Sequence, residues 1–278
     1  DYDTALARVA ALGKAADALV AKEADHAAAD LAAKQKADET EAALDAISAD
    51  DLKQKSAEEQ VALLDALRGQ KKKLTPKQRE LQIKVYMAMD LDPEFVKIDD
   101  ARRDRLKDAI RDDEELQAAR ANWADTDPDT MIPPERKIAL LTKTLKAECE
   151  IYGMPVPQVQ TFSEPPGDLG SYNPTNNVIN INIHEEATFD DFFDTIDTIV
   201  HENAHNYQDY LVMQLEEGLI QPGDPEYNQA LMFAANSGAY AYVTGSEDRA
   251  CYNKQPLEEH AWKTGGDVQK ALKAGPTV

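Results

Sequence analysis

The amino-acid sequence predicts a mainly α-helical protein with a small β-sheet, an α+β fold. Up to about Asp50, roughly two residues in five are Ala, mixed with Lys, Asp and Glu, a composition that strongly favours helices. Between residues 56 and 153, helix start and stop signals recur. After Gly153 the sequence turns to Pro, Gly, Asn and β-branched residues, which favour turns and strands. These changes divide the chain into a helical arm at 1–55, a helical scaffold at 56–153 and a third domain at 154–278.

The Ala-rich arm carries one thin apolar stripe. Its apolar residues recur at steps of three and four: Leu6, Val9, Leu12, Ala16 and Leu19. This spacing predicts a long exposed helix that packs as a helical hairpin or a coiled-coil arm. A spacer or packing arm is the simpler interpretation, and a binding surface for a protein partner is the alternative.

The scaffold region contains well-defined helix boundaries. Ser56 and Glu59 have the spacing of a capping box, and Gly69 is expected to end the helix that follows. A helix that starts near Pro134 is expected to end near Gly153. Two further helices are predicted to begin at Thr75-Pro76 and at Asp92-Pro93.

The arginines of this region do not predict a basic patch. Arg102, Arg103 and Arg105 lie among aspartates at helical spacing. We expect these charges to pair along a solvent-exposed helix face.

Two strands are predicted in the third domain, at Gln158–Phe162 and Asn177–Ile183. In the second strand, Ile alternates with Asn, as in a strand with one buried face and one polar face. If this strand lies at the edge of the sheet, its free backbone groups could receive an extended peptide.

The overall charge and apolar pattern exclude several classes of partner. The chain has 278 residues, with 30 Lys and Arg against 52 Asp and Glu, a formal net charge of −22. Nucleic acids and anionic lipids bind to clustered positive charge, so neither is an expected partner. No apolar run reaches the ~18 residues of a membrane span, so no membrane-spanning helix is expected.

The cysteines and the first residue bear on the cellular compartment. Cys149 and Cys251 are expected to be free and buried rather than paired. The sequence starts at Asp1 instead of Met, as in a mature form cut from a longer precursor or in a trimmed chain. A periplasmic or secreted location is therefore slightly favoured over a cytoplasmic one.

A helical apolar period from Phe192 leads directly into His201-Glu202-Asn203-Ala204-His205, an HExxH sequence. Two histidines four residues apart project from one helix face, about one turn apart, so both can bind one metal ion. Glu202 is offset by about 100° and can reach a water at the metal. The simpler alternatives are a coincidental pair of surface histidines and a zinc site that only stabilises the fold.

Catalytic zinc generally has three protein ligands, so a third is required. A metzincin continuation would need Gly at position 208 and His at 211, but the chain has Gln208 and Leu211. Further along, the segment 252–262 reads YNKQPLEEHAW, in which Pro256 opens a helix with Glu258 in its first turn and Ala261 three residues later. This combination resembles the gluzincin clan of zinc metallopeptidases. The resemblance implies that residues 154–278 form a zincin-like catalytic domain with Glu258 as the third ligand.

The neighbours of Glu258 compete for this role. Glu259 points about 100° away and His260 about 200° away, so one of the three can face the metal. The interval from His205 to Glu258 leaves room for one more helix, predicted at Tyr227–Tyr242. The wider pattern is also similar to uncharacterised bacterial metallopeptidase domains, some of them associated with toxin or secretion systems.

The resemblance implies a zinc-dependent hydrolase that cleaves peptide or amide bonds in a peptide or protein substrate. Glu202 would be the general base, and Tyr252 the first candidate to stabilise the oxyanion, with Tyr240 or Tyr242 as alternatives. Asp248 or Glu247 would hold the imidazoles in place. The alternatives are a non-catalytic zincin-fold protein that binds or regulates a partner, and an interbacterial toxin peptidase.

Overall fold

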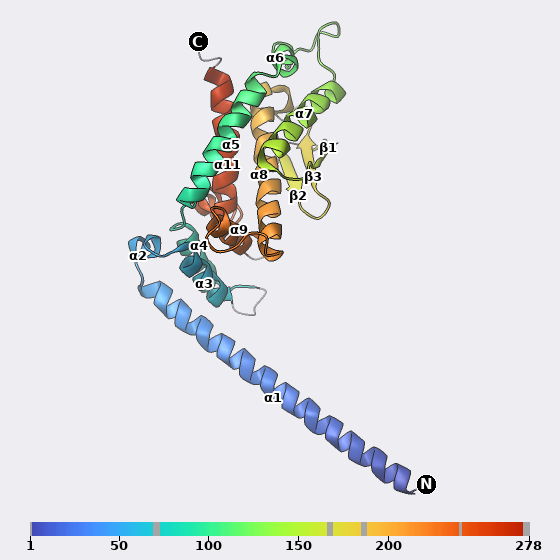
Figure 1. Cartoon of the computed structure of the whole chain (residues 1–278), viewed down its shortest axis with the longest axis vertical. Coiled ribbons are helices and arrows are strands. Elements are labelled where there is room, and N and C mark those ends of the chain that lie inside the picture. The colour runs from blue at the N-terminus through green and yellow to red at the C-terminus, as the bar shows by residue number, and fades with distance from the viewer. Residues whose placement is uncertain (1, 69–72, 166–168, 185–187, 239–240, 275–278) are drawn as a thin grey trace. The chain divides into compact units, whose positions relative to one another are not determined.

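A computed structural model describes residues 2–68, 73–165, 169–184, 188–238 and 241–274. Within these ranges the chain is mainly helical, with eleven α-helices and one three-stranded sheet, which confirms the predicted fold class (Figure 1). The chain forms two compact units, Asp1–Ala88 and Met89–Val278. These units differ from the predicted division at residues 55 and 153.

The described residues of the first unit form four helices. The predicted capping box at Ser56 is confirmed: the Ser56 N–H donates to Glu59 Oε2 at 2.9 Å, and the Glu59 N–H donates to Ser56 Oγ at 3.2 Å. Thr75 and Gln78 form a second capping box at the predicted Thr75-Pro76 start. Gly69, the predicted helix end, lies outside the described residues. The helices are α1 (Tyr2–Ala46), α2 (Ala49–Lys53), α3 (Ala57–Arg68) and α4 (Pro76–Tyr86).

Helix α1 runs as one continuous helix of 45 residues rather than as a hairpin. The side chains of residues 2–19, and with them the predicted apolar stripe, lie outside the description. From Val20 to Leu31 the helix is exposed to solvent. Near its end Leu44 is buried, and α1, α3 and α4 contact one another; buried leucines on these helices and α2 are Leu52, Leu64, Leu67 and Leu81.

Residues from both sides of the predicted boundary near residue 153 pack in shared hydrophobic clusters, which explains why both sides belong to the second unit. Leu106 and Leu141 pack in the same cluster as Ile196 and Ile199 of the helix that carries the HExxH sequence. Helices from the predicted scaffold therefore support the candidate site directly. They are α5 (Pro93–Arg111), α6 (Glu114–Arg120) and α7 (Pro134–Tyr152).

The predicted start of α5 and the predicted end of α7 are confirmed. Asp92 caps α5 by accepting the N–H groups of Glu94 and Phe95. Gly153 ends α7 with a φ of 71°, a left-handed conformation that favours glycine. Cys149 of α7 and Cys251 are free and buried, as predicted.

The prediction of a solvent-exposed charged face on α5 is wrong for its central pair. Asp99 and Arg103 are each 1 % exposed and form a salt bridge inside the unit, whereas Arg105 remains exposed. Burial follows because the C-terminal helix packs against this side of α5, and His260 and Asp267 of that helix approach the pair. Such long-range packing leaves no local signal in the α5 sequence.

The sheet contains the two predicted strands and one that the sequence did not predict. Strand β3 (Val178–Asn182) pairs in parallel with β1 (Gln158–Phe162) and antiparallel with β2 (Gly170–Asn173), giving the order β1-β3-β2. The Asn177–Ile183 segment is therefore the central strand, and the expectation that it could receive a peptide at a free edge is wrong. Strands β1 and β2 form the two edges.

The remaining helices carry or flank the candidate site. Helix α8 (Phe192–Glu216) follows a short 3-10 turn, η1 (Thr188–Asp190), and lies alongside α11 (Pro256–Ala274) (Figure 1). In the sequence, α9 (Tyr227–Ser237) and α10 (Arg249–Lys254) lie between these two helices. Helix α9 ends at Ser237, five residues before the predicted end at Tyr242.

Two small residues let α11 approach α8 closely. Ala261 is fully buried, and a Cβ atom placed on Gly265 would lie 2.8 Å from the Asp197 carbonyl oxygen.

Within the described residues, no helix is long and apolar enough to cross a membrane.

Candidate metal centre

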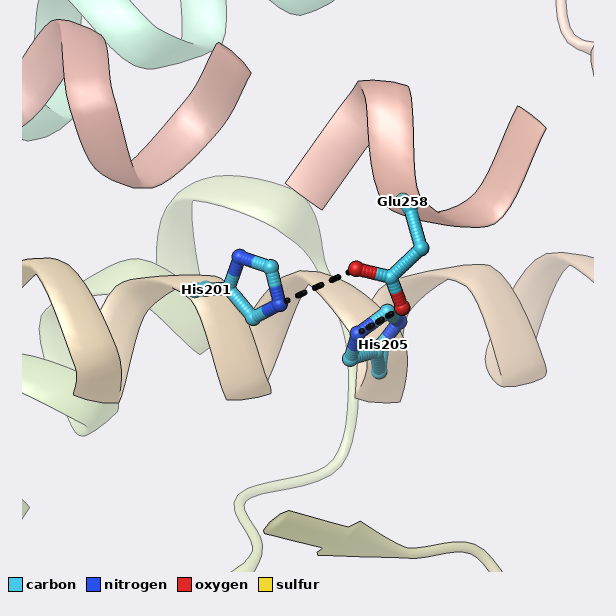
Figure 2. A group of neighbouring side chains, drawn as sticks. All are labelled: His201, His205 and Glu258. Atoms are coloured by element: carbon cyan, nitrogen blue, oxygen red, sulfur yellow. Dashed lines mark ion pairs between the residues drawn. The ribbon is translucent and has the colours of Figure 1, made fainter. Parts of the chain in front are cut away.

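Three side chains from two helices meet at one point. His201 and His205 project from the same side of α8, and Glu258 in the first turn of α11 points between them (Figure 2). His201 Nε2 lies 3.6 Å from Glu258 Oε2, and His205 Nε2 lies 3.5 Å from Glu258 Oε1. The three donor atoms all lie within 4.8 Å of one another. The structure thus brings together the three residues that the sequence predicted as ligands.

The donors fit a divalent metal ion. Two imidazole nitrogens and one carboxylate oxygen are a typical ligand set of catalytic zinc, and Co²⁺, Mn²⁺ and Ni²⁺ also accept it. Glu258 Oε2 is buried and has no hydrogen-bond partner among the described residues, as expected for an atom that binds a cation. Burial, followed by the neighbouring His205, lowers the pKa of His201 to about 3, so this imidazole is neutral, as a metal ligand must be.

The two competing neighbours of Glu258 lie elsewhere. Glu259 accepts a hydrogen bond from Lys254 Nζ at 2.6 Å and is absent from the cluster of donors. His260 is fully buried on another side of α11, between Gln208 and Asp99. Their positions follow the angular offsets expected on a helix.

A buried chain of polar groups supports His205. Its Nδ1 lies 2.8 Å from Gln208 Oε1, and the Gln208 amide N–H donates to the Leu257 carbonyl at 2.8 Å. The same amide nitrogen lies 2.9 Å from His260 Nδ1, and His260 Nε2 faces Asp99 Oδ1 at 3.4 Å. Gln208 therefore contacts one ligand directly, and it also contacts the residue before Glu258.

The polarity of this chain fixes the imidazole tautomers. Because the amide oxygen of Gln208 can only accept, His205 Nδ1 carries the proton and leaves Nε2 for a metal. Because the amide nitrogen can only donate, His260 Nδ1 accepts, and the His260 proton lies on Nε2 toward Asp99. Burial, followed by the Arg103 charge, lowers the pKa of His260 well below its usual value, which keeps this ring neutral.

The sequence analysis did not identify this support. Asp248, one predicted partner, caps α10 by accepting the Cys251 N–H at 2.9 Å. Glu247, the other, accepts the Thr244 N–H at 2.9 Å. The spacing of Gln208 three residues after His205 was a usable signal, because such pairs meet on a helix surface. The burial of Asp99 had no such signal.

Two of the three predicted tyrosines lie in the described part of the chain, and they occupy different positions at the site. The Tyr242 hydroxyl donates to Glu258 Oε1 at 2.5 Å and so holds the candidate ligand. Tyr252 lines the adjoining cavity, with its ring 6.0 Å from that of Tyr242. Burial, followed by the Glu258 charge, raises the pKa of Tyr252 to about 12, so its hydroxyl stays protonated and can donate. Tyr240 lies outside the described residues.

A cavity of about 500 Å³ opens onto the three donors. Helix α8 contributes Glu202 to its lining, strand β2 contributes Gly170, and Tyr252 and Leu257 line another side. A Cβ atom on Gly170 would lie 3.1 Å from the Asn180 carbonyl oxygen and 3.2 Å from Glu202 Cγ. The lack of a side chain at this position therefore lets β2 pack close to the carboxylate of the HExxH sequence.

Comparisons of this chain with protein-family models, with curated proteins and with solved structures gave no match.

Proposed function

We propose that this protein is a zinc-dependent hydrolase of peptide or amide bonds, with a site of the gluzincin type. The observation that carries the proposal is the convergence of His201, His205 and Glu258 on the wall of a cavity that Glu202 also lines. Zinc that only stabilises a fold is usually enclosed by four protein ligands, whereas these three donors open onto space for a substrate.

Each residue of the site has a defined part in hydrolysis. Zinc held by the three donors would supply Lewis acidity toward a water molecule and the scissile carbonyl. The Glu202 carboxylate takes a proton from the water as its oxygen bonds to the carbonyl carbon, and delivers a proton to the amine nitrogen as the C–N bond breaks. The Tyr252 hydroxyl donates to the carbonyl oxygen as negative charge develops there.

The edge of the sheet supports a peptide substrate. Strand β2 is an edge strand, and its residues Gly170, Ser171 and Tyr172 line the cavity beside Glu202. An extended peptide that pairs with this edge would pass over the HExxH helix. Strand β2 therefore takes the part that the sequence analysis gave to the segment Asn177–Ile183.

The proposal is tested with the full chain loaded with one equivalent of zinc and a mixed peptide library. We expect cleavage by the parent protein and a loss of at least about a hundredfold in the rate for Glu202→Gln, with zinc content unchanged. Glu217→Gln, a matched change at an exposed position at the end of α8, is expected to retain the parent rate. Stoichiometric zinc without any cleavage would contradict the hydrolase and favour a non-catalytic binding protein.

A further inference from the structure

The cavity continues along α8 beyond the candidate ligands. Asp209 and Val212 follow His205 by four and seven residues, so all three lie along one side of the helix and line the cavity. Because the helix rises 1.5 Å per residue, Asp209 lies about 6 Å beyond His205 along the axis. Tyr172 and Pro174, in and just after β2, line the same cavity.

The lining of this cavity is negatively charged. Its carboxylates are Glu202, Asp209 and Glu258, and the described lining residues include neither Lys nor Arg. In the part of the chain that the structure describes, Asp209 forms no ion pair. Burial raises the pKa of Asp209, the Tyr172 hydroxyl lowers it, and the nearby Glu216 raises it again. The Asp209 side chain is exposed to solvent in the cavity, and its nearest charged neighbours have its own sign.

The surroundings of Asp209 match a side chain that is apolar along its length and cationic at its end. Val212 and Pro174 offer apolar surface for methylene groups, and the Asp209 carboxylate can accept charge-assisted hydrogen bonds. The methylene stem of a Lys or Arg side chain is long enough to bridge the roughly one helical turn between the candidate ligands and Asp209. An acidic side chain placed beside Asp209 would meet repulsion from this carboxylate.

We propose that Asp209 forms a subsite for a Lys or Arg side chain of the substrate, next to the bond that is cleaved. This inference rests on the proposed peptide hydrolase, since it assigns the substrate class of the same cavity.

The test measures binding, so that it does not depend on turnover. The zinc-loaded full chain carrying Glu202→Gln is titrated with three blocked five-residue alanine peptides, whose central residue is Lys, norleucine or Glu. Norleucine keeps the aliphatic stem of Lys and lacks its charge. We expect the Lys peptide to bind about tenfold more tightly than the norleucine peptide, and the Glu peptide to bind most weakly.

Adding Asp209→Asn is expected to remove the preference for Lys over norleucine. Glu217→Gln, an exposed change at the end of α8 away from the cavity, serves as the matched control and should keep it. Equal affinity for the Lys and norleucine peptides, or a preference that survives Asp209→Asn, would overturn the subsite. If the preference depends on Asp209 but the parent protein cleaves none of the peptides, the subsite stands and the hydrolase fails.

Discussion

Replacing Gln208 with Leu should weaken metal binding without removing a ligand. Leu has a similar volume but can make none of the three contacts of the Gln208 amide, to His205, His260 and the Leu257 carbonyl. At about 1 kcal/mol for each buried hydrogen bond, the loss in the free energy of unfolding is about 3 kcal/mol. Removing a hydrogen bond that orients a metal-binding imidazole typically reduces metal affinity 10- to 100-fold, and we expect a loss in that range.

The assay separates the effect on the metal from the effect on the fold. Zinc affinity is measured by competition with a chromophoric chelator, and the free energy of unfolding by urea titration in the presence of EDTA. Gln229→Leu is the matched control, because Gln229 is also fully buried and accepts the Asp92 N–H at 2.8 Å, away from the candidate ligands. We expect the control to lower stability and leave zinc affinity unchanged. A zinc affinity for Gln208→Leu within twofold of the parent would refute the reasoning about His205.

Three other substitutions give distinct expectations. Gly265→Ala places a methyl group against Asp197 and should push α11 away from α8, which lowers the free energy of unfolding by about 1–3 kcal/mol and weakens zinc binding. In the control Gly266→Ala, the methyl group meets no atom within 4 Å, so stability should be unchanged or slightly higher; urea titration compares the two. Tyr242→Phe removes the hydrogen bond to a candidate ligand and should weaken zinc binding about tenfold by chelator competition. Burial raises the pKa of Glu148 from 4.5 to about 8. Between these values the unfolded chain has lost this proton and the folded chain keeps it, so stability falls as the pH rises through that range. Glu148→Gln should reduce the difference in the free energy of unfolding between pH 5 and pH 8, and an unchanged difference would contradict the assignment.

Local chemistry made much of the fold predictable. The capping box at Ser56, the helix start at Thr75-Pro76 and the helix end at Gly153 depend on neighbouring residues alone, and all three form where the sequence placed them. The helical apolar period before the HExxH sequence predicted that this sequence lies on a helix, and it does. The small Ala261 three residues after Glu258 indicated the face of α11 that approaches α8. The meeting of the three candidate ligands was therefore predictable, and metal binding itself stays a prediction.

Features set by distant segments could not be predicted. Strand β2 consists of Gly, Ser, Tyr and Asn, a poor strand composition that forms only because β3 pairs with it. The place of β3 at the centre of the sheet depends on both partners. The burial of Asp99 and Arg103 depends on α11, more than 150 residues later in the chain. The hydrogen-bond chain that supports His205 combines a residue that is near in the sequence, Gln208, with one that is distant, Asp99.

The most direct test of a three-ligand metal site is zinc X-ray absorption spectroscopy on the full chain loaded with one equivalent of zinc. The account predicts two imidazole nitrogens at about 2.0–2.1 Å and carboxylate oxygen at about 2.0–2.2 Å. It also predicts that Glu258→Ala changes the spectrum and lowers zinc affinity, while Glu259→Ala, one residue along the same helix, changes neither. A protein that retains no zinc, or a spectrum that is the same with and without the Glu258 carboxylate, would contradict it.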